Sequence, residues 1–204
     1  MRARHKKWTA PYLAEHPEVA LTEIDANDPF FLHSPLYLEI GMGKGDFLLG
    51  LAKKQPGHYL GIEREGDVLA IALKKILSEE AEGNIRLIQG DFDFLVEKIQ
   101  NLSFDAIYLN FSDPWPKRRH WKRRLETSER LLKMKDLLKK GGRIIFKSDD
   151  QDLYQFTLEQ AQGHFQILEA TNDYQLEESD VASEYEKNFR SIGKPITRII
   201  LKKE

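Results

Sequence analysis

The sequence predicts an α/β fold, in which a doubly wound and mostly parallel sheet of seven strands carries an antiparallel strand at one edge. From residue 35 on, short apolar runs alternate with amphipathic stretches. Strands that alternate with helical patterns of about 10–15 residues are typical of βαβ units and a parallel sheet. No helical pattern separates the last two apolar runs, so we expect them to pair antiparallel at one edge.

The predicted strands are short apolar runs, and the predicted helices are the amphipathic stretches between them. The strands cover residues 36–41, 58–63, 85–91, 104–111, 142–149, 165–171 and 196–203. The helices cover approximately residues 46–54, 66–80, 94–100, 128–140 and 151–162. The polar segment 172–195 is longer than most connections, which favours a functional loop.

The length of 204 residues suits one domain with small additions. We expect a basic N-terminal extension over residues 1–34 and the α/β domain over residues 35–204. Hydrophobic residues make up 41% and charged residues 31%, which indicates a folded core.

The composition excludes several kinds of chemistry. The chain has no cysteine, which removes disulfides, cysteine-ligated zinc and cysteine nucleophiles. No pattern predicts a metal site. No apolar run approaches the roughly 20 residues of a membrane helix, and the basic start MRARHKKW is not followed by the apolar region of a secretory signal. We therefore expect a cytoplasmic protein.

Basic residues are concentrated in two blocks, residues 2–7 and 117–124. Ten of the 31 basic residues lie there, which leaves 21 basic residues against 33 acidic ones elsewhere. Two basic blocks on an acidic body, with Trp8 and Trp121 beside them, favour a docking face for a nucleic acid. Simple solvated charge runs are the alternative.

The sequence EIGMGKGDF follows the first predicted strand and contains Gly41, Gly43 and Gly45. Glycines at such a turn let the backbone bend sharply and let a ligand approach the peptide. The spacing differs from the dinucleotide pattern G-x-G-x-x-G, and no Walker Lys-Ser pair follows, so a nicotinamide cofactor is disfavoured.

An acidic residue stands at the end of each of the first five predicted strands: Glu39, Glu63, Asp91, Asp113 and Asp149. Ligands of open parallel sheets bind at the carboxyl ends of the strands, where a carboxylate commonly accepts ribose hydroxyls. An acidic site without phosphate ligands suits S-adenosylmethionine, a cationic nucleoside. Asp91 and Asp149 have the alternative role of helix N-caps.

The motifs resemble those of the bacterial tRNA (guanine-N7-)-methyltransferases, a branch of the Rossmann-like class I S-adenosylmethionine-dependent methyltransferases. EIGMGKG and LGIE are generic to that class, whereas DPWPK followed by H-x-K-R-R-L is much more specific. The resemblance extends from the basic N-terminus to SEYEKNFRSIGKPI and therefore covers essentially the whole chain.

The resemblance implies a role for each candidate residue. Cofactor contacts are expected from Glu39, Gly41, Gly43, Gly45, Glu63, Asp91 and Asp113, with Asp113 also catalytic. Contacts to the target guanosine are expected from Lys117, Asp149, Ser183, Glu184, Tyr185 and Glu186. RNA contacts are expected from Arg119, His120, Trp121, Lys122, Arg123 and Arg124.

Two positions depart from the family pattern. Ser183 stands where threonine is usual and keeps the hydroxyl, while Trp121 stands where relatives are often polar and either stacks on RNA or packs against protein. Trp115 likewise either walls the base or fills the core.

The expected reaction is direct methyl transfer from the sulfonium to guanine N7, whose lone pair carries no proton. No covalent intermediate or strong base is needed, so catalysis rests on positioning and electrostatics. Asp113 would stabilise the purine as it becomes cationic.

Three other functions remain open at this stage. An amino-group methyltransferase acting on adenine or cytosine usually has Pro-Pro and an aromatic residue after the acid, whereas Trp115 separates the two prolines here. A non-catalytic RNA-binding protein leaves the strand-end acids unexplained, and a small-molecule methyltransferase leaves the basic blocks unused. The sequence is compatible with a monomer or a homodimer.

Overall fold

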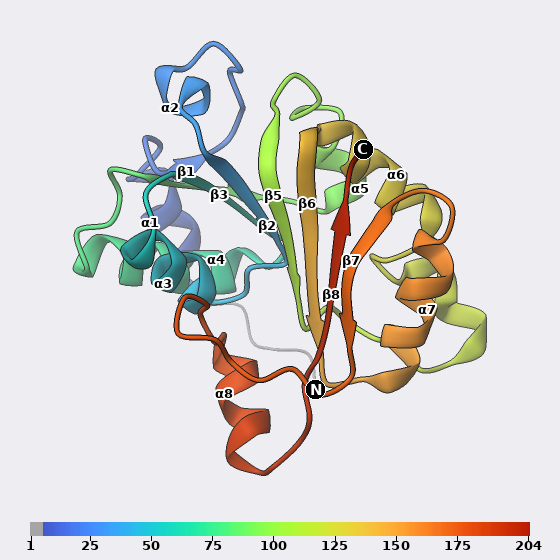
Figure 1. The fold of residues 1–204 in the computed structure, drawn as a ribbon. Helices are drawn as coiled ribbons and strands as arrows, with labels where there is room; N and C mark the ends of the chain where they lie inside the picture. The colour runs from blue at the N-terminus through green and yellow to red at the C-terminus, as the bar shows by residue number, and fades with distance from the viewer. Residues whose placement is uncertain (1–5) are drawn as a thin grey trace. The chain divides into compact units, whose positions relative to one another are not determined.

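The computed structural model describes residues 6–204, and the chain divides between Ile99 and Gln100 into two compact units (Figure 1). Each unit combines parallel strands with helices, as the sequence predicts for an α/β protein. Arg2 and Arg4 of the N-terminal basic block lie outside the described residues.

The first unit contains four parallel strands in the order β1-β4-β3-β2. Its elements are α1 (Thr9–Ala14), β1 (Ala20–Leu21), α2 (Pro29–Leu32), β2 (Leu36–Ile40), α3 (Asp46–Lys54), β3 (His58–Glu63), α4 (Gly66–Ser78), β4 (Ile85–Gln89) and α5 (Phe92–Leu95).

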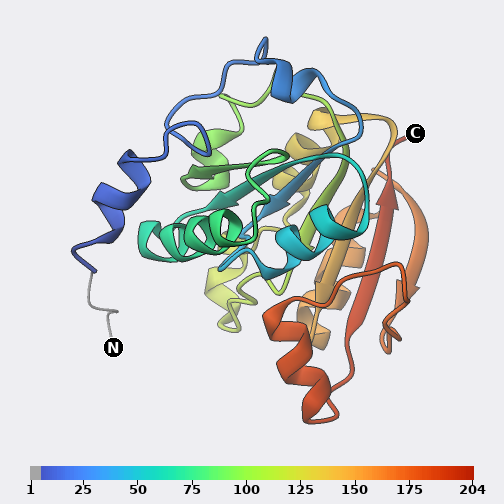
Figure 2. The same ribbon diagram turned by 90° about the vertical axis from the view of Figure 1, so that its left-hand side faces the viewer.

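Apolar side chains on the strands and helices build the core of this unit. Leu38, Leu60, Leu73 and Leu87 are fully buried, one each from β2, β3, α4 and β4. Helix α1 packs against α4 (Figure 2). The carboxylate of Asp67 on α4 accepts from the Thr9 hydroxyl and, at 2.9 Å, from the Lys6 N–H.

The second unit contains four strands in the order β5-β6-β8-β7. Strands β5 and β6 are parallel, whereas β8 pairs antiparallel with both β6 and β7. Its elements are β5 (Phe104–Asn110), the 3₁₀ helix η1 (Arg118–Arg123), α6 (Ser128–Leu137), β6 (Leu138–Ser148), α7 (Gln151–Ala161), β7 (Gln166–Thr171), α8 (Glu184–Ser191) and β8 (Thr197–Lys202).

Helices α6 and α7 lie together beside these strands, and α8 lies apart from them near the start of β8 (Figure 1). Helix α7 begins where it does because the Asp150 carboxylate accepts from the Leu153 N–H at 2.7 Å and caps its first turn. Phe146 on β6 and Ile199 on β8 are fully buried and pair in register, which joins the two strands through the core.

The prediction of a mostly parallel α/β architecture is confirmed, including the antiparallel pairing of the last two strands. The structure contains an eighth strand, β1, which the sequence did not predict. Its two residues are too few to show a hydrophobic pattern. Helix α6 ends at Leu137 and β6 begins at Leu138, so the predicted boundary near residue 140 was wrong. Helix α5 ends at Leu95, which is shorter than the predicted helix over residues 94–100.

The connection over residues 172–195 contains the eight-residue helix α8 instead of being loop throughout. Among residues 6–204, none of the helices has both the length and the apolar character required to span a membrane.

Candidate active site

The acids of the first unit lie where parallel neighbouring strands end. Glu39 is near the end of β2, Glu63 ends β3, and Asp91 follows β4 and caps α5 by accepting from Asp93 N–H at 3.0 Å. Because β2, β3 and β4 run parallel side by side, these carboxyl groups share one edge of the sheet. Glu39 is only 2% exposed, so its carboxyl group is shielded from water.

The glycine loop is held by the neighbouring strand. The Gly43 N–H donates to Glu63 Oε2 at 3.0 Å, and the Glu65 N–H donates to Glu63 Oε1 at 2.9 Å. Gly43 has a φ of 58°, and a Cβ built there would meet no atom within 4 Å. The Gly43 backbone is thus left-handed and open on the side of the missing side chain, which is what close approach of a ligand to the peptide needs.

The third glycine of the loop serves packing as well as conformation. Gly45 precedes α3 with a φ of 76°, and a Cβ there would lie 3.1 Å from the Ala72 Cβ on α4. The loop, α3 and α4 therefore approach one another closely only because this position lacks a side chain.

In the second unit, Asp113 occupies a turn between two residues with left-handed backbone conformation. Phe111 has a φ of 54° and Trp115 a φ of 43°, values that non-glycine residues rarely adopt. The Asp113 side chain is exposed. Such conformations persist only where surrounding contacts hold them, and they concentrate at functional sites.

Three contacts hold this turn. The Phe111 N–H donates to the carbonyl of Lys147 at 2.8 Å. The Ser112 hydroxyl donates to Oε1 of Glu126, a fully buried residue. Arg124 Nε donates to the Pro114 carbonyl at 2.8 Å.

Glu126 is a site residue that the sequence reasoning missed. Burial raises the pKa of its carboxyl to about 7, although the Ser112 hydroxyl and the charges of Arg124 and Arg130 act in the opposite direction. A buried glutamate with a pKa near neutrality is therefore hydrogen-bonded to Ser112, the residue before Asp113.

The basic segment after the turn forms the 3₁₀ helix η1, and its cations are not equivalent. The side chains of Arg119, Lys122 and Arg123 are exposed, as phosphate contacts require. The Arg124 guanidinium is instead turned inward, to the Pro114 carbonyl and over the ring of Phe156 at 4.6 Å.

The two tryptophans of the region differ in their surroundings. The Arg123 guanidinium carbon lies over the Trp115 ring, 4.9 Å from the ring centroid. The rings of Trp115 and His120 meet edge-on, with centroids 6.0 Å apart. Trp121 packs beside Phe156 with ring centroids 6.3 Å apart and remains 42% exposed. Trp121 thus both contacts protein and presents ring surface to solvent.

Asp149 follows β6 and forms an ion pair with Lys194. The alternative role of helix cap belongs to its neighbour, Asp150, which caps α7. Asp149 and Asp113 follow the parallel neighbours β6 and β5 and so lie at the same edge of this unit.

The four substrate residues expected at 183–186 divide into two inward and two outward side chains. Ser183 is buried and caps α8, accepting from the Glu186 N–H at 3.1 Å, and Glu186 is fully buried. Glu184 is exposed, and Tyr185 is 60% exposed. The Tyr185 ring is near-parallel to that of Phe111 at a centroid distance of 6.4 Å, which brings α8 beside the Asp113 turn.

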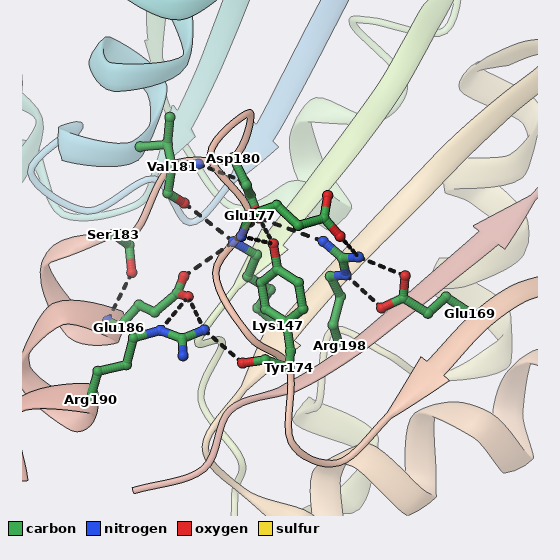
Figure 3. A network of polar contacts seen from close by, with 10 residues as sticks. All are labelled: Lys147, Glu169, Tyr174, Glu177, Asp180, Val181, Ser183, Glu186, Arg190 and Arg198. Carbon is green, nitrogen blue, oxygen red and sulfur yellow. Dashed lines mark hydrogen bonds and ion pairs between the residues drawn. The ribbon is translucent and has the colours of Figure 1, made fainter. Parts of the chain in front are cut away.

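A buried lysine, Lys147, pairs with the inward Glu186 (Figure 3). Lys147 Nζ lies 2.6 Å from Asp180 Oδ2 and 3.1 Å from Glu186 Oε2, and it donates to the Val181 carbonyl at 3.2 Å. The far side of Glu186 accepts two hydrogen bonds from Arg190, at 2.9 and 2.7 Å.

Arg198 on β8 extends the same network (Figure 3). It donates to both oxygens of Glu169 at 2.6 Å and to Glu177 at 2.9 Å, and it lies 3.7 Å from the ring centroid of Tyr174. Burial raises the pKa of Asp180, but the neighbouring Lys147 ammonium and its hydrogen bonds outweigh burial and hold that pKa below its usual value.

One sequence signal pointed to this network. Lys147 is a lysine inside the apolar run GRIIFKSD, a position at which a strand buried on both faces normally carries a hydrophobic residue. Its partners lie 33 to 39 residues further along the chain, in a polar segment without periodicity, so no pattern in the sequence paired them.

The family described as "Putative methyltransferase" matches residues 33–199. The tRNA (guanine-N(7)-)-methyltransferase of Limosilactobacillus reuteri (strain DSM 20016) is 39% identical, and the alignment covers 98% of each chain.

Two solved structures share the fold. A 30S ribosomal A1408 methyltransferase from an uncultured bacterium has a TM-score of 0.63 at 16% identity, covering 91% of this chain and 98% of that one. A putative methyltransferase complexed with SAH has a TM-score of 0.60 at 12% identity, covering 88% of this chain and 50% of that one.

The fold and the family match define a Rossmann-like methyltransferase, as the sequence predicts. Within that class, the chain belongs to the family of tRNA (guanine-N7-)-methyltransferases, because the similarity to a curated member extends over nearly its whole length.

Proposed function

We propose that this protein transfers a methyl group from S-adenosylmethionine to N7 of a guanosine in tRNA, and that Asp113 is its catalytic residue. The observation that carries the proposal is the turn itself, in which an exposed Asp113 stands between the left-handed residues Phe111 and Trp115, five residues before the start of the basic helix η1. The turn thus places a carboxylate beside the cations that suit a polyanion.

The residues of the first unit fit the methyl donor. Glu39, Glu63 and Asp91 share the carboxyl edge of three parallel strands, and the Gly43 backbone is open to a ligand. A carboxylate at Glu63 suits ribose hydroxyls, and the acidic edge suits a cationic molecule without phosphates. When bound, S-adenosylmethionine supplies an electrophilic methyl group on a positively charged sulfur.

The bond changes require no proton transfer at the reacting atom. The N7 lone pair forms the new N–CH₃ bond while the electron pair of the S–CH₃ bond remains on sulfur, which becomes a neutral thioether. The positive charge therefore passes from the sulfonium to the purine. A carboxylate near the base, for which we propose Asp113, attracts the purine more strongly as this charge develops and so lowers the barrier.

The polar groups around the turn support binding of a nucleotide. The side chains of Lys117, Arg119, Lys122 and Arg123 are exposed, which supports phosphate contacts, and Tyr185 presents ring surface two residues after the buried Ser183. A target base in folded RNA has to be turned out to reach such a site, which costs a few kcal/mol. We propose that the protein works in the cytoplasm, with its tRNA substrate.

Transfer of tritium from methyl-labelled S-adenosylmethionine to bulk tRNA tests the reaction, and mass analysis of the digested nucleosides identifies the product. We expect 7-methylguanosine. Methylated adenine or cytosine amino groups indicate the amino-group methyltransferase, and an unlabelled tRNA fraction that still binds the protein indicates a non-catalytic RNA-binding protein.

Asp113→Asn tests the catalytic residue against the exposed control Asp173→Asn. Removing a group that stabilises transition-state charge lowers kcat roughly 100-fold or more. We expect that loss for Asp113→Asn, with cofactor affinity weakened at most moderately, and near wild-type kinetics for the control. Normal turnover in Asp113→Asn excludes the assignment.

A further inference from the structure

Lys147 is hydrogen-bonded to the Asp113 turn and forms an ion pair with helix α8. Its carbonyl accepts from the Phe111 N–H at 2.8 Å, two residues before Asp113. Its ammonium lies 3.1 Å from Glu186 Oε2, on the first turns of α8. The backbone and the side chain of one residue thus contact two segments that are far apart in the sequence.

The ammonium has no capacity left for a substrate. A lysine ammonium has three N–H donors. Asp180, Glu186 and the Val181 carbonyl supply three acceptors at 2.6, 3.1 and 3.2 Å, and the side chain is 1% exposed. Lys147 therefore acts through the residues that it holds.

Aromatic contacts also connect the Asp113 turn directly to α8. The ring of Phe111 is near-parallel to those of Tyr185 and Phe189, at centroid distances of 6.4 and 5.6 Å. Phe111 is tied to the Lys147 carbonyl, and α8 is tied to the Lys147 ammonium through Glu186. These links hold the exposed Tyr185 beside Phe111, two residues before Asp113 in the chain.

Building on the proposed function, we propose that Lys147 is a positioning residue for the tRNA methylation site, which docks α8 so that Tyr185 meets the target nucleoside beside Asp113. The buried pair with Glu186 does the docking, so in this proposal Glu186 acts by holding α8 and not by the direct guanosine contact that the resemblance implies. Loss of the pair frees α8, so the affinity for tRNA falls. The affinity of the first unit for the cofactor stays the same.

Lys147→Met alone removes the cation from the fully buried Glu186 carboxylate and from the largely shielded Asp180 carboxylate, a change that often destabilises a fold. The test variant is therefore K147M/E186Q, which removes one cation and one anion together. Asp180 then keeps the Tyr174 hydroxyl at 2.7 Å and Arg198 at 3.7 Å. The milder Glu186→Gln leaves the Lys147–Asp180 pair in place.

The matched control is Lys139→Met, which removes a lysine from the same strand and breaks its 2.7 Å ion pair with Asp105. This pair is one-third exposed and is not part of the Lys147 network. Thermal unfolding and S-adenosylhomocysteine binding confirm for each variant that the fold and the cofactor half are intact.

Amide hydrogen exchange and steady-state kinetics then decide the proposal. In K147M/E186Q we expect at least tenfold faster exchange over Glu184–Ser191 and at least a tenfold higher KM for tRNA. We expect cofactor affinity within twofold of wild type and kcat reduced less than KM is raised. Glu186→Gln should also raise the exchange rate over α8 and the KM for tRNA, but by less. Lys139→Met should change neither the exchange rate nor the KM.

Unchanged exchange in α8 overturns the proposal, and so does faster exchange with an unchanged KM for tRNA. The exchange measurement does not depend on catalysis. If wild-type protein leaves tRNA unmethylated, the proposed function fails, whereas the docking of α8 by Lys147 is still judged by exchange.

Discussion

The hydroxyl of Ser112 donates a hydrogen bond to the buried carboxyl group of Glu126, which joins the residue next to Asp113 to a side chain with no access to solvent. Burial raises the pKa of Glu126 to about 7. The turn that carries Asp113 is therefore supported by a group whose charge changes near neutral pH.

The pH dependence of stability follows from this shift. The folded protein keeps the Glu126 proton between about pH 4.5 and 7, where the unfolded chain has lost it, so stability falls as pH rises through that window. A shift of that size corresponds to a cost on the order of 3 kcal/mol above pH 7. We expect Glu126→Gln to remove the cost. In urea titrations, the free energy of unfolding of the variant minus that of wild type should therefore increase from pH 5 to pH 8. Parallel pH profiles for the two proteins would show that Glu126 is not the group responsible.

The left-handed conformation of Phe111 is a second measurable feature. Phe111→Gly and Phe111→Ala both delete the ring, but only glycine adopts a φ of 54° without strain. We expect the glycine variant to be the more stable of the two by about 1 kcal/mol in urea denaturation. Equal stability would mean that the chain relaxes out of this conformation once the ring is removed.

The basic residues of the segment should divide into two functional groups. Arg119 is exposed, so Arg119→Ala should weaken tRNA binding and reduce the slope of log affinity against log salt by about 1. Arg124 is bonded to Pro114, so Arg124→Ala should lower kcat and leave the salt slope unchanged. Filter-binding titrations at several salt concentrations distinguish them, and identical slopes for both variants contradict the division.

The anchor of the glycine loop should control cofactor affinity. Glu63 accepts hydrogen bonds from Gly43 and Glu65, and we propose that it also accepts the ribose hydroxyls, so Glu63→Ala should lower S-adenosylhomocysteine affinity at least tenfold by calorimetry. The exposed neighbour Glu65→Ala is the control and should bind normally. Full affinity in Glu63→Ala would remove this residue from the cofactor site.

Most of the fold could be predicted because strand and helix patterns depend on local sequence. The strand that ends at Glu63 and the helix that follows it were both visible as hydrophobic periodicity. The two-residue β1 carries too little pattern, and Glu186, the one buried residue of α8, is charged, so the segment lacks the apolar periodicity of a helix and was predicted as loop.

Motifs singled out Asp113 and the glycine loop as candidate site residues, and their roles in the reaction stay predictions. The inward roles of Glu186 and Arg124 were not predictable, because a charged residue in a sequence is expected at the surface unless a partner is known. Their partners, Lys147 and the Pro114 carbonyl, become apparent only when distant segments are brought together.

The pairing of Lys147 with Glu186 also limits how this region can diverge among natural relatives. The two positions are 39 residues apart, yet a neutral residue at either one removes a buried ion-pair partner from the other, which then keeps only Asp180 or Arg190. We expect them to co-vary across the family, so that a relative with an apolar residue at the lysine position also lacks the glutamate. Viable lineages should therefore lose both charges together or keep both.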